Sequence, residues 1–213
     1  MRILITGISG FVGPYLARYI AETAPGAEIW GLVWAAEPAK ANSGIRLVEG
    51  DLTDISTLKA ALKQVQPEII FHLAASSSVA SSWDHPGRFL EVNAVGTVNL
   101  LEVVRLQNLD ARVVVSSSAE VYGAVPKEQQ PITERSPLEP LSPYAASKAA
   151  QDLLTAQYFY GHGMPTIRLR LFHHTGPGRP TQFVASSFAY QIARIERGID
   201  PPRLAVGNLE AVR

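Results

Sequence analysis

Tyr144 and Lys148 are the two residues of this chain whose types and spacing point most directly to chemistry. They stand four apart in the stretch Ser-Pro-Tyr-Ala-Ala-Ser-Lys at 142–148. Side chains at this spacing project from the same side of a helix, so the ammonium can lie close to the phenol. A nearby positive charge lowers the pKa of a phenol and favours proton exchange near neutral pH. The pair therefore suits acid–base chemistry at the oxygen of a carbinol or carbonyl.

A cluster of hydroxyl groups could join this pair. The apolar run 113–115 leads into three serines, the last of which is Ser118, followed by Glu120. Pro143 suits the first turn of a helix, so Tyr144 and Lys148 should face the carboxyl edge of a sheet, where this strand also ends. The alternative is a serine-rich turn whose hydroxyls bond their own backbone.

A turn with glycine spacing follows the first apolar run. Gly7, Gly10 and Gly13 let a backbone approach a pyrophosphate closely, and the helix that begins there favours negative charge. We therefore expect a bound dinucleotide, although such a turn can also bind nothing. The expected contacts are Gly7, Ser9, Gly10, Phe11, Val12 and Gly13.

The next two strand ends bear on which dinucleotide is bound. Residues 32–35, Leu-Val-Trp-Ala, offer neither a carboxylate for the adenosine ribose nor an arginine for a phosphate, so both NAD and NADP remain open. Asp51 and Leu52 follow the third apolar run and could contact adenine. Alternatively, Asp51 or Thr53 caps the next helix.

The elements that must position these residues alternate along the chain. The apolar runs are too continuous for a half-exposed antiparallel sheet and predict buried parallel strands. Alternation with helices implies right-handed crossovers and an α/β fold with a Rossmann-like doubly wound parallel sheet. We expect strands at 3–6, 28–34, 46–49, 68–73, 112–116 and 166–171, and helices at 11–23, 54–65, 86–107 and 143–160.

The later part of the chain is less regular. Five prolines between 125 and 143 predict a shaped loop over the carboxyl edge of the sheet rather than a domain boundary. Beyond Gly176 the pattern weakens. We expect one more helix at 183–197 and a short strand at 203–206.

Composition excludes several classes of function. The 213 residues are 46% apolar and 18% charged, with 19 basic and 19 acidic side chains, so no net charge favours nucleic acid or a membrane surface. The absence of cysteine excludes disulfides, thiolate nucleophiles and sulfur-bound zinc. The start of the chain lacks the features of a signal peptide, and no segment is long and apolar enough to span a membrane, so we expect a cytoplasmic protein.

Together, the three motifs resemble the extended short-chain dehydrogenase/reductase family of nucleotide-sugar epimerases, dehydratases and reductases, across essentially the whole chain. The resemblance implies an NAD- or NADP-dependent enzyme in which Tyr144 exchanges a proton with the sugar oxygen. It implies that Ser118 orients that oxygen, while Lys148 binds the nicotinamide ribose and stabilises phenolate. Further implied cofactor contacts are Leu73, Ala74, Ala75 and Ser77.

Segments 172–179, 183–184 and 206–213 resemble the GDP-mannose branch of this family, which implies a GDP-linked hexose as substrate. Two activities compete. Phe11-Val12 favours reduction of the 4-keto group of GDP-4-keto-6-deoxy-mannose, because GDP-mannose 4,6-dehydratases usually carry Gln-Asp there. The alternative is the dehydratase, because Glu120 matches the position of the base that removes the C5 proton in dehydratases. Reductases can also carry an acid at this position, so Glu120 does not decide between the two activities. Glu120 could also be a solvated loop carboxylate with no role in catalysis. A 4-epimerase, a non-catalytic NAD(P)-binding protein and a structural protein are further alternatives.

The same resemblance assigns residues late in the chain. His173 stands where relatives usually have an asparagine that contacts the substrate's phosphates. Side chains of neighbours such as His173 and His174 point apart on an extended segment, and with no third ligand we expect no metal site. Arg213 matches a residue that grips phosphate, but could simply be a frayed terminal arginine. The implied substrate contacts are Ser118, His173, Val184 and Arg213, and the implied late cofactor contacts are His174 and Arg179.

The resemblance also predicts the domain organisation. We expect an NAD(P)-binding domain at 1–175 and the start of a substrate-binding part at 176–213. Family members usually continue well beyond this last motif, so the substrate-binding part is expected to be small and incomplete. Family dimers pair the helices that begin near Pro86 and Pro143, and we therefore expect a homodimer.

Overall fold

The structure is a computed structural model that describes residues 1–34 and 44–209, and it divides the chain into two compact units. The first unit, Met1–His173, contains the sheet and the helices that cover it. The second unit, His174–Arg213, contains helix α7 (Val184–Glu196), as predicted for this segment.

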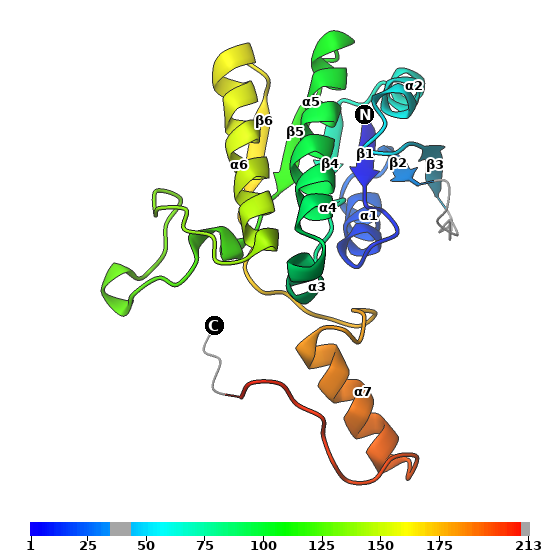
Figure 1. Ribbon diagram of the computed structural model, residues 1–213. Coiled ribbons are helices and arrows are strands. Elements are labelled where there is room, and N and C mark those ends of the chain that lie inside the picture. Colours follow the sequence, from blue (N-terminus) through cyan, green and yellow to red (C-terminus); the bar gives the residue numbers. More distant parts are fainter. Residues whose placement is uncertain (35–43, 210–213) are drawn as a thin grey trace. The chain divides into compact units, whose positions relative to one another are not determined.

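The first unit is built on a six-stranded sheet in the order β3-β2-β1-β4-β5-β6 (Figure 1). Every neighbouring pair is parallel, which confirms the predicted doubly wound α/β fold. Thr6 at the end of β1 is in register with Leu32 on one side and His72 on the other, so the strand ends meet at one carboxyl edge. The strands are β1 (Arg2–Thr6), β2 (Glu28–Val33), β3 (Ile45–Glu49), β4 (Ile69–His72), β5 (Arg112–Ser116) and β6 (Thr166–Leu169).

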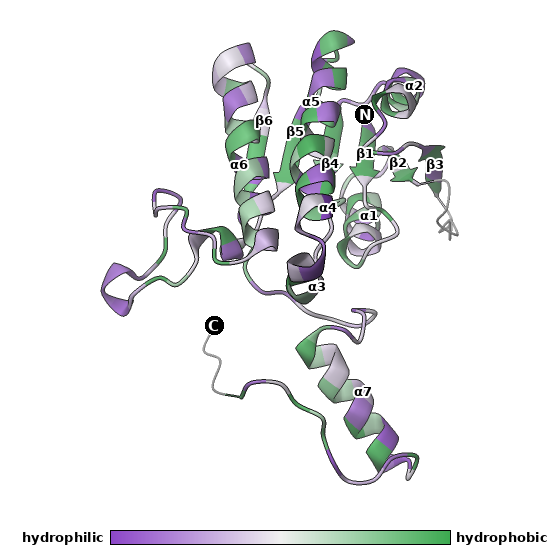
Figure 2. Ribbon diagram, in the orientation of Figure 1, coloured by the Kyte–Doolittle hydropathy of each residue, from purple (hydrophilic) through white to green (hydrophobic). Residues whose placement is uncertain are grey.

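Alternation along the strands divides the core between the two faces of the sheet. Leu4 and Ile70 pack with helices α2 (Ile55–Val65) and α5 (Gly96–Leu106), whereas Ile3 and Ile5 pack with helix α1 (Val12–Thr23). The central strands are mostly hydrophobic in Figure 2, as expected for a sheet covered on both faces. Helix α6 (Pro143–His162) lies beside α5, with Tyr158 in the same cluster as Leu4.

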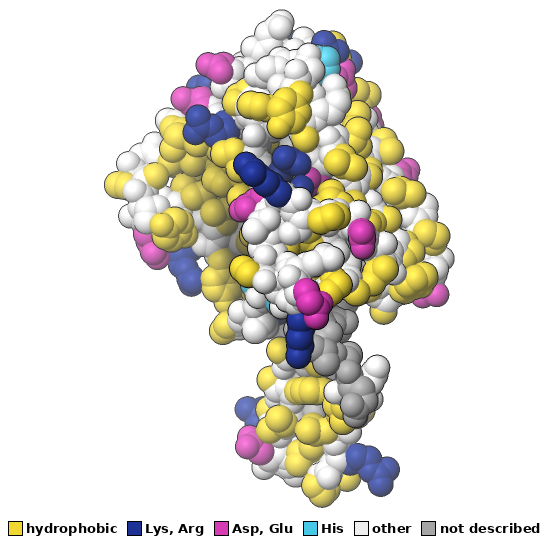
Figure 3. All heavy atoms as spheres, turned by 90° about the vertical axis from the view of Figure 1, so that its left-hand side faces the viewer, with side chains coloured by type: hydrophobic (Ala, Val, Ile, Leu, Met, Phe, Trp, Pro, Cys, Tyr) yellow, Lys and Arg dark blue, Asp and Glu magenta, His cyan; other side chains and the backbone are white. Residues whose placement is uncertain are grey.

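The two edge strands correct the prediction that all six strands are buried. Ile167, Arg168 and Leu169 of β6 are exposed, and only Val48 of β3 is fully buried. In the described part of the chain, each of these strands has a neighbour on one side only. Figure 3 faces the β6 edge and shows hydrophobic side chains there interspersed with basic ones.

Local capping explains where helix α6 begins and ends. The Ser142 hydroxyl accepts the backbone N–H of Ala145, and Pro143 occupies the first turn, as expected for a helix start. The helix stops at Gly163, which adopts a left-handed conformation with φ of 66°. This stop lies slightly beyond the predicted end.

The segment predicted as one helix at 86–107 is more elaborate. Helix α4 (Pro86–Leu90) passes through a π-helical turn at Glu91–Val95 into α5, and a short helix α3 (Val79–Asp84) precedes it. The sequence did not indicate α3, which is only six residues long. The π-turn places Asn93 in the interior, a placement that helical periodicity alone does not predict.

The predicted strand at 203–206 is wrong. The backbone of Ala205 bonds the side chain of Gln191 on α7: its N–H donates to Oε1 at 2.7 Å, and its carbonyl accepts from Nε2 at 3.1 Å. These bonds take the groups that a neighbouring strand would need. None of the helices in the described residues is long and apolar enough to cross a membrane.

Candidate active site

The glycine turn is shaped by two close backbone contacts. A Cβ on Gly7 would lie 2.7 Å from the Ala74 nitrogen, and one on Gly13 would lie 2.5 Å from the Ile8 carbonyl oxygen. Gly7 also has a φ of 73°, which side chains other than hydrogen rarely adopt. The backbone of the turn is therefore not covered by side chains at the start of α1. No side chain within the described residues caps this helix. These features fit a dinucleotide pyrophosphate.

A pocket of about 260 Å³ lies beside this turn at the carboxyl ends of β1, β2 and β4. Most of the predicted cofactor residues of the first unit line it: Gly7, Ser9, Gly10, Asp51, Leu52, Leu73, Ala74 and Ala75. Six other predicted cofactor residues of this unit do not line the pocket: Phe11, Val12, Gly13, Ser77, Tyr144 and Lys148. Sequence reasoning missed six further lining residues: Leu32, Trp34, Gly50, Thr53, Arg88 and Val92. The first four lie at or shortly after a strand end, which was the available signal, whereas Arg88 in α4 and Val92 in the π-helical turn had no such signal.

Asp51 plays a local structural role that differs from the expected one. Its Oδ1 accepts the backbone N–H and the hydroxyl of Thr53, each at 2.8 Å. The next helix is instead capped by Asp54, whose Oδ1 accepts the Ser56 N–H at 2.8 Å. The alternative that Asp51 or Thr53 caps this helix is therefore wrong, and Asp51 shapes a turn at the mouth of the pocket.

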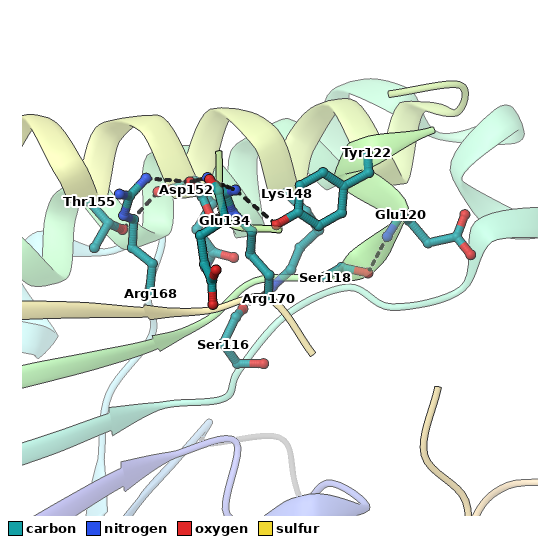
Figure 4. Close-up of polar contacts among 11 residues, drawn as sticks. Ser116, Ser118, Glu120, Tyr122, Glu134, Lys148, Asp152, Thr155, Arg168 and Arg170 are labelled. Carbon is teal, nitrogen blue, oxygen red and sulfur yellow. Dashed lines mark hydrogen bonds and ion pairs between the residues drawn. The ribbon is translucent and has the colours of Figure 1, made fainter. Parts of the chain in front are cut away.

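Lys148 is deeply buried on α6, with 3% of the residue exposed. Its Nζ donates to the carbonyl oxygen of Ser116 at 2.5 Å, so the amine lies at the carboxyl end of β5 (Figure 4). Burial lowers the pKa of Lys148 to about 7, and the negative charge of Asp152 partly opposes this shift. The amine can therefore exchange a proton near neutral pH.

Ser118 lies at the same edge, in the turn that follows β5. Its Oγ accepts the backbone N–H of Glu120 at 3.2 Å and thereby begins the short helix Ala119–Tyr122. The backbone N–H of Ser117 donates to the Leu169 carbonyl at the end of β6, and that of Ala119 donates to the Leu171 carbonyl just beyond it, which holds this turn from the other side. The hydroxyl does bond its own backbone, but only as an acceptor, so its proton can still be donated to a ligand.

Tyr144 lies half-buried in the first turn of α6, one turn before Lys148. Its ring packs edge-on against Phe89, with ring centres 6.4 Å apart. The Ser147 hydroxyl donates to the carbonyl of Tyr144 at 2.7 Å and accepts from the Asn93 amide at 2.9 Å. Helix α6 is thus anchored directly to the π-helical turn.

Asn93 also joins this helix to the pocket beside the glycine turn. Its Oδ1 accepts the Ser76 N–H at 2.8 Å and its Nδ2 donates to the Ser76 carbonyl at 3.0 Å. Ser76 stands between the pocket residue Ala75 and Ser77. Sequence reasoning missed Asn93; the signal available was an amide within an otherwise apolar helical stretch.

Glu120 and His173 approach each other beyond the serine turn. The His173 Nε2 lies 3.7 Å from the Glu120 Oε1, and the side chains are 63% and 34% exposed, respectively. The structure therefore brings the predicted C5 base close to the residue that replaces the usual asparagine. Figure 4 shows the Glu120 carboxylate pointing away from the Asp152 cluster.

An ionic cluster between α6 and the β6 edge supports the short helix that follows the serine turn. The fully buried Asp152 pairs with Arg168 at 2.7 Å and with Arg170 at 2.9 Å (Figure 4). Arg170 also donates to the Tyr122 hydroxyl at 3.0 Å and to the Glu134 carbonyl at 2.9 Å. Burial opposes ionisation of Asp152, but the bonds and charges of the two arginines outweigh it and lower its pKa.

Neither part of this cluster was predicted, although Asp152 stands four residues after Lys148, and the two arginines stand two residues apart, Arg168 in β6 and Arg170 just after it. A hollow of about 520 Å³ runs along β6 beside the cluster and is lined by Tyr122, Phe159, Arg168 and Phe172, among others. It lies away from the glycine turn. We assign no role to it.

The remaining predicted residues belong to the second unit or lie outside the described residues. Arg179 donates to the His174 carbonyl and stacks on Phe183, with 4.0 Å from its guanidinium carbon to the ring centre. Val184 opens α7 and is 65% exposed. Arg213 lies outside the described residues. Among the residues that are described, no group of three or more His, Cys, Asp or Glu could hold a metal ion.

Comparison with known proteins identifies the family of the chain. The family described as GDP-mannose 4,6 dehydratase matches residues 4–213. The chain is 33% identical over 212 residues to GDP-6-deoxy-D-mannose reductase of Pseudomonas aeruginosa, covering 100% of this chain and 65% of that protein. It is 34% identical over 227 residues to GDP-mannose 4,6-dehydratase of Yersinia enterocolitica, covering 100% of this chain and 60% of that protein.

Among solved structures, RMD from Pseudomonas aeruginosa, complexed with NADPH, superposes with a TM-score of 0.80 at 32% identity, covering 98% of this chain and 65% of that chain. The chain spans just under two thirds of the length of these proteins. The family match, the identities and the shared fold lead to one conclusion. The chain belongs to the GDP-mannose 4,6-dehydratase family, within the extended short-chain dehydrogenase/reductases.

Proposed function

We propose that this chain is part of an NAD(P)-dependent oxidoreductase that reduces the 4-keto group of GDP-4-keto-6-deoxy-mannose. The observation that carries the proposal is the placement of Lys148. The buried amine is held against the Ser116 carbonyl at the end of β5, between the helix that carries Tyr144 and the turn that carries Ser118. This arrangement suits proton transfer to a carbonyl oxygen.

The dinucleotide would be held by the glycine turn and the pocket beside it. Gly7 and Gly10 leave room for the pyrophosphate, and Asp51 and Leu52 border the region expected for adenine. A pyrophosphate near the start of α1 would be stabilised by backbone N–H groups and the helix dipole. Trp34 and Arg88 also line the pocket and are further candidates for contact.

When bound, the dinucleotide supplies the hydride. The residues of the chain manage the proton: Tyr144 gives its phenolic proton to the sugar oxygen as negative charge develops there. Ser118 donates a hydrogen bond to the same oxygen, because its own lone pair already receives the Glu120 N–H. Lys148 stabilises the phenolate left on Tyr144 and is itself oriented by Ser116.

The reductase is preferred to the dehydratase because Phe11-Val12 occupies the turn where dehydratases of this branch usually carry Gln-Asp. The match to the reductase of Pseudomonas aeruginosa covers the full length of this chain and 65% of that protein. Glu120 favours the dehydratase as the second candidate, since a carboxylate beside the serine turn could remove a carbon-bound proton. The two activities differ in substrate and in net redox change, so they can be separated by assay.

The decisive assay supplies the protein with GDP-mannose or with its 4-keto-6-deoxy derivative, each with NADH, NADPH, NAD or NADP. We expect nicotinamide oxidation and a 6-deoxy-hexose product only from the keto substrate. Product from GDP-mannose alone would establish the dehydratase instead. Dinucleotide binding with no turnover of either substrate would support a non-catalytic binding protein.

Tyr144→Phe tests the proton donor within the same assay. We expect turnover to fall by about 10² to 10⁴-fold, since the phenol proton is lost, while dinucleotide affinity stays within about threefold. Tyr160→Phe is the matched control, because Tyr160 lies at the far end of α6 and is 80% exposed. Equal turnover of the Tyr144 variant and the wild type would exclude Tyr144 as the proton donor.

We further propose the setting in which this enzyme works. Residues 1–175 would bind the dinucleotide and residues 176–213 would begin the substrate-binding part, with His173, His174, Arg179, Val184 and Arg213 contributing as the family resemblance implies. Large exposed apolar side chains on the π-helical turn, α5 and α6, such as Val95, Leu106 and Leu153, support a homodimer. We also propose a cytoplasmic location. Sedimentation measurements and cell fractionation would test these two points.

A further inference from the structure

A chain of neutral hydrogen bonds crosses the interior beneath the dinucleotide pocket. At its centre is His72, the last residue of β4, which is completely buried. Its Nδ1 lies 2.8 Å from the Thr6 hydroxyl and its Nε2 lies 2.9 Å from the Thr97 hydroxyl. One ring thus joins the strand that leads into the glycine turn to helix α5.

The partners of Thr97 determine which ring nitrogen carries the proton. The Thr97 hydroxyl lies 2.6 Å from the Asn93 carbonyl, an oxygen that can only accept, so the hydroxyl proton must lie there. Gln151 on α6 donates its amide N–H to the same hydroxyl at 2.7 Å. The Thr97 oxygen can therefore serve His72 only as an acceptor, and the Nε2 of His72 must carry a hydrogen.

The opposite nitrogen is then fixed as an acceptor. With the proton on Nε2, the neutral ring receives the Thr6 hydroxyl proton at Nδ1. The Thr6 oxygen in turn accepts the backbone N–H of Ala74 at 3.2 Å. Each hydrogen bond from Thr97 through His72 to Thr6 and Ala74 thus has one donor and one acceptor. The last of these residues, Ala74, lines the pocket.

We propose that His72 is a positioning residue of the dinucleotide pocket, held as the neutral Nε2–H tautomer between Thr6 and Thr97. The tautomer assignment stands on the hydrogen-bond geometry alone, whereas the effect on the dinucleotide rests on the proposed function. The site is sensitive to this chain because Gly7 and Ala74 are in such close contact that a Cβ would not fit between them. A shift of Ala74 would move the floor of the pocket.

The electrostatic surroundings favour the same neutral state. Burial, and secondarily the nearby positive charge of Lys148, lower the pKa of His72 to about 3. A protonated ring would have to donate from both nitrogens, which would displace the Thr6 proton and place a second cation near Lys148. The ring should therefore be uncharged at neutral pH.

Nitrogen NMR of histidine rings tests the assignment directly on the wild-type chain. The sequence has five histidines, and the signal of His72 can be identified by its loss in His72→Gln. We expect a protonated Nε2, an unprotonated Nδ1 and no titration between pH 5.5 and 9, the limits of the experiment. A protonated Nδ1, or titration near the ordinary value of 6.5, would overturn the proposal.

Two variants at position 97 then test positioning. Thr97→Val removes the acceptor, so Thr6 becomes the remaining partner and the proton should move to Nδ1. Thr97→Ser keeps the hydroxyl and should keep the Nε2–H tautomer. We expect dinucleotide affinity to fall about tenfold in Thr97→Val and to stay within about threefold in Thr97→Ser.

The outcomes separate this proposal from the proposed function. If the wild type binds neither NADH nor NADPH, the proposed function fails while the tautomer result still stands by itself. If the wild type binds one of them and Thr97→Val binds it equally well after the proton has moved, the positioning role is excluded. Should Thr97→Val fail to fold, an Nδ1–H tautomer in wild type or in Thr97→Ser would still refute the assignment.

Discussion

Gln151 and Asp152 are neighbours on α6, and both are completely buried, yet they belong to networks of opposite kind. Gln151 joins the neutral chain through Thr97 and His72, beneath the glycine turn. Asp152 joins the ionic cluster with Arg168 and Arg170, behind the serine turn. Both networks hold the helix that carries Tyr144 and Lys148.

The difference follows from what surrounds each network. The arginine side chains are 33% and 12% exposed, so the ionic cluster reaches solvent at the β6 edge, and two cations share one carboxylate. The neutral chain lies between β1, β4, α5 and α6, close to the buried Lys148. A further ion there would lose its hydration without gaining a partner of opposite charge. The ionic cluster therefore combines a buried carboxylate with arginines that reach the β6 edge, whereas the chain of hydrogen bonds through His72 and Thr97 is built from neutral groups.

The largest expected effect is on the ionic side. Asp152→Asn leaves two partly buried guanidinium groups without a counter-ion and should lower the free energy of unfolding by about 3 kcal/mol. Urea unfolding at pH 7 measures this. The pKa of Asp152 is lower in the folded protein than its unfolded value of 3.8. Asp152 therefore contributes its full stabilisation above pH 3.8, and this contribution to the free energy of unfolding is lost as the pH falls through the folded-state pKa.

Arg168→Met is the matched comparison for the same cluster. Arg168 is the more exposed arginine, and its loss leaves the pair between Asp152 and Arg170 intact, so we expect a loss of about 1 kcal/mol. A loss for Asp152→Asn no greater than that for Arg168→Met would show that the buried carboxylate does not organise the cluster.

The second expected effect concerns the boundary between the networks, where Lys148 lies. Its folded pKa of about 7 is below the unfolded value of 10.5, so above pH 7 the unfolded chain binds more protons than the folded one. The stability of the wild type relative to Lys148→Met should therefore rise, by roughly 2 kcal/mol between pH 7 and 9. Urea unfolding of both proteins across this range measures the difference. A constant or falling difference would mean that the amine stays charged when folded.

The smallest expected effect is on the neutral side. In Gln151→Met the hydrogen bond to Thr97 is lost, but so is the side-chain Oε1, which is buried and has no partner among the described residues. These changes offset each other, so the free energy of unfolding should fall by no more than about 1 kcal/mol. If this variant is as destabilised as Asp152→Asn under the same conditions, the contrast between the networks is incorrect.

Much of the fold could be predicted because the pattern of the sequence is local. Continuous apolar runs mark the parallel strands, and Ser142-Pro143 marks the start of α6. The sequence did not show which strands are edges, so β6 was expected to be buried. It also did not show that Ala205 would bond the Gln191 side chain instead of a neighbouring strand. Both features depend on contacts between distant residues.

The same limit applies to the site. The glycine turn, Ser118 and Lys148 are recognisable by spacing and by their position after strands. Asn93, Asp152 and His72 were missed because each is a polar residue within an apolar stretch, and sequence gives no sign of the partner that satisfies it. Their partners lie 16 or more residues away, in or just after β6 or in other elements, except where Thr97 meets Asn93 one turn later.

The central claim is that the carboxyl edge of this sheet holds a nicotinamide dinucleotide. Titration of the protein with NADPH and NADH, followed through the fluorescence of Trp34 in the pocket lining, tests it most directly. We predict saturable binding of at least one of them, abolished by Gly10→Leu, which fills the turn, and retained in Gly161→Leu at the far end of α6. Binding of neither dinucleotide to the wild type, or equal binding to all three proteins, would contradict the account.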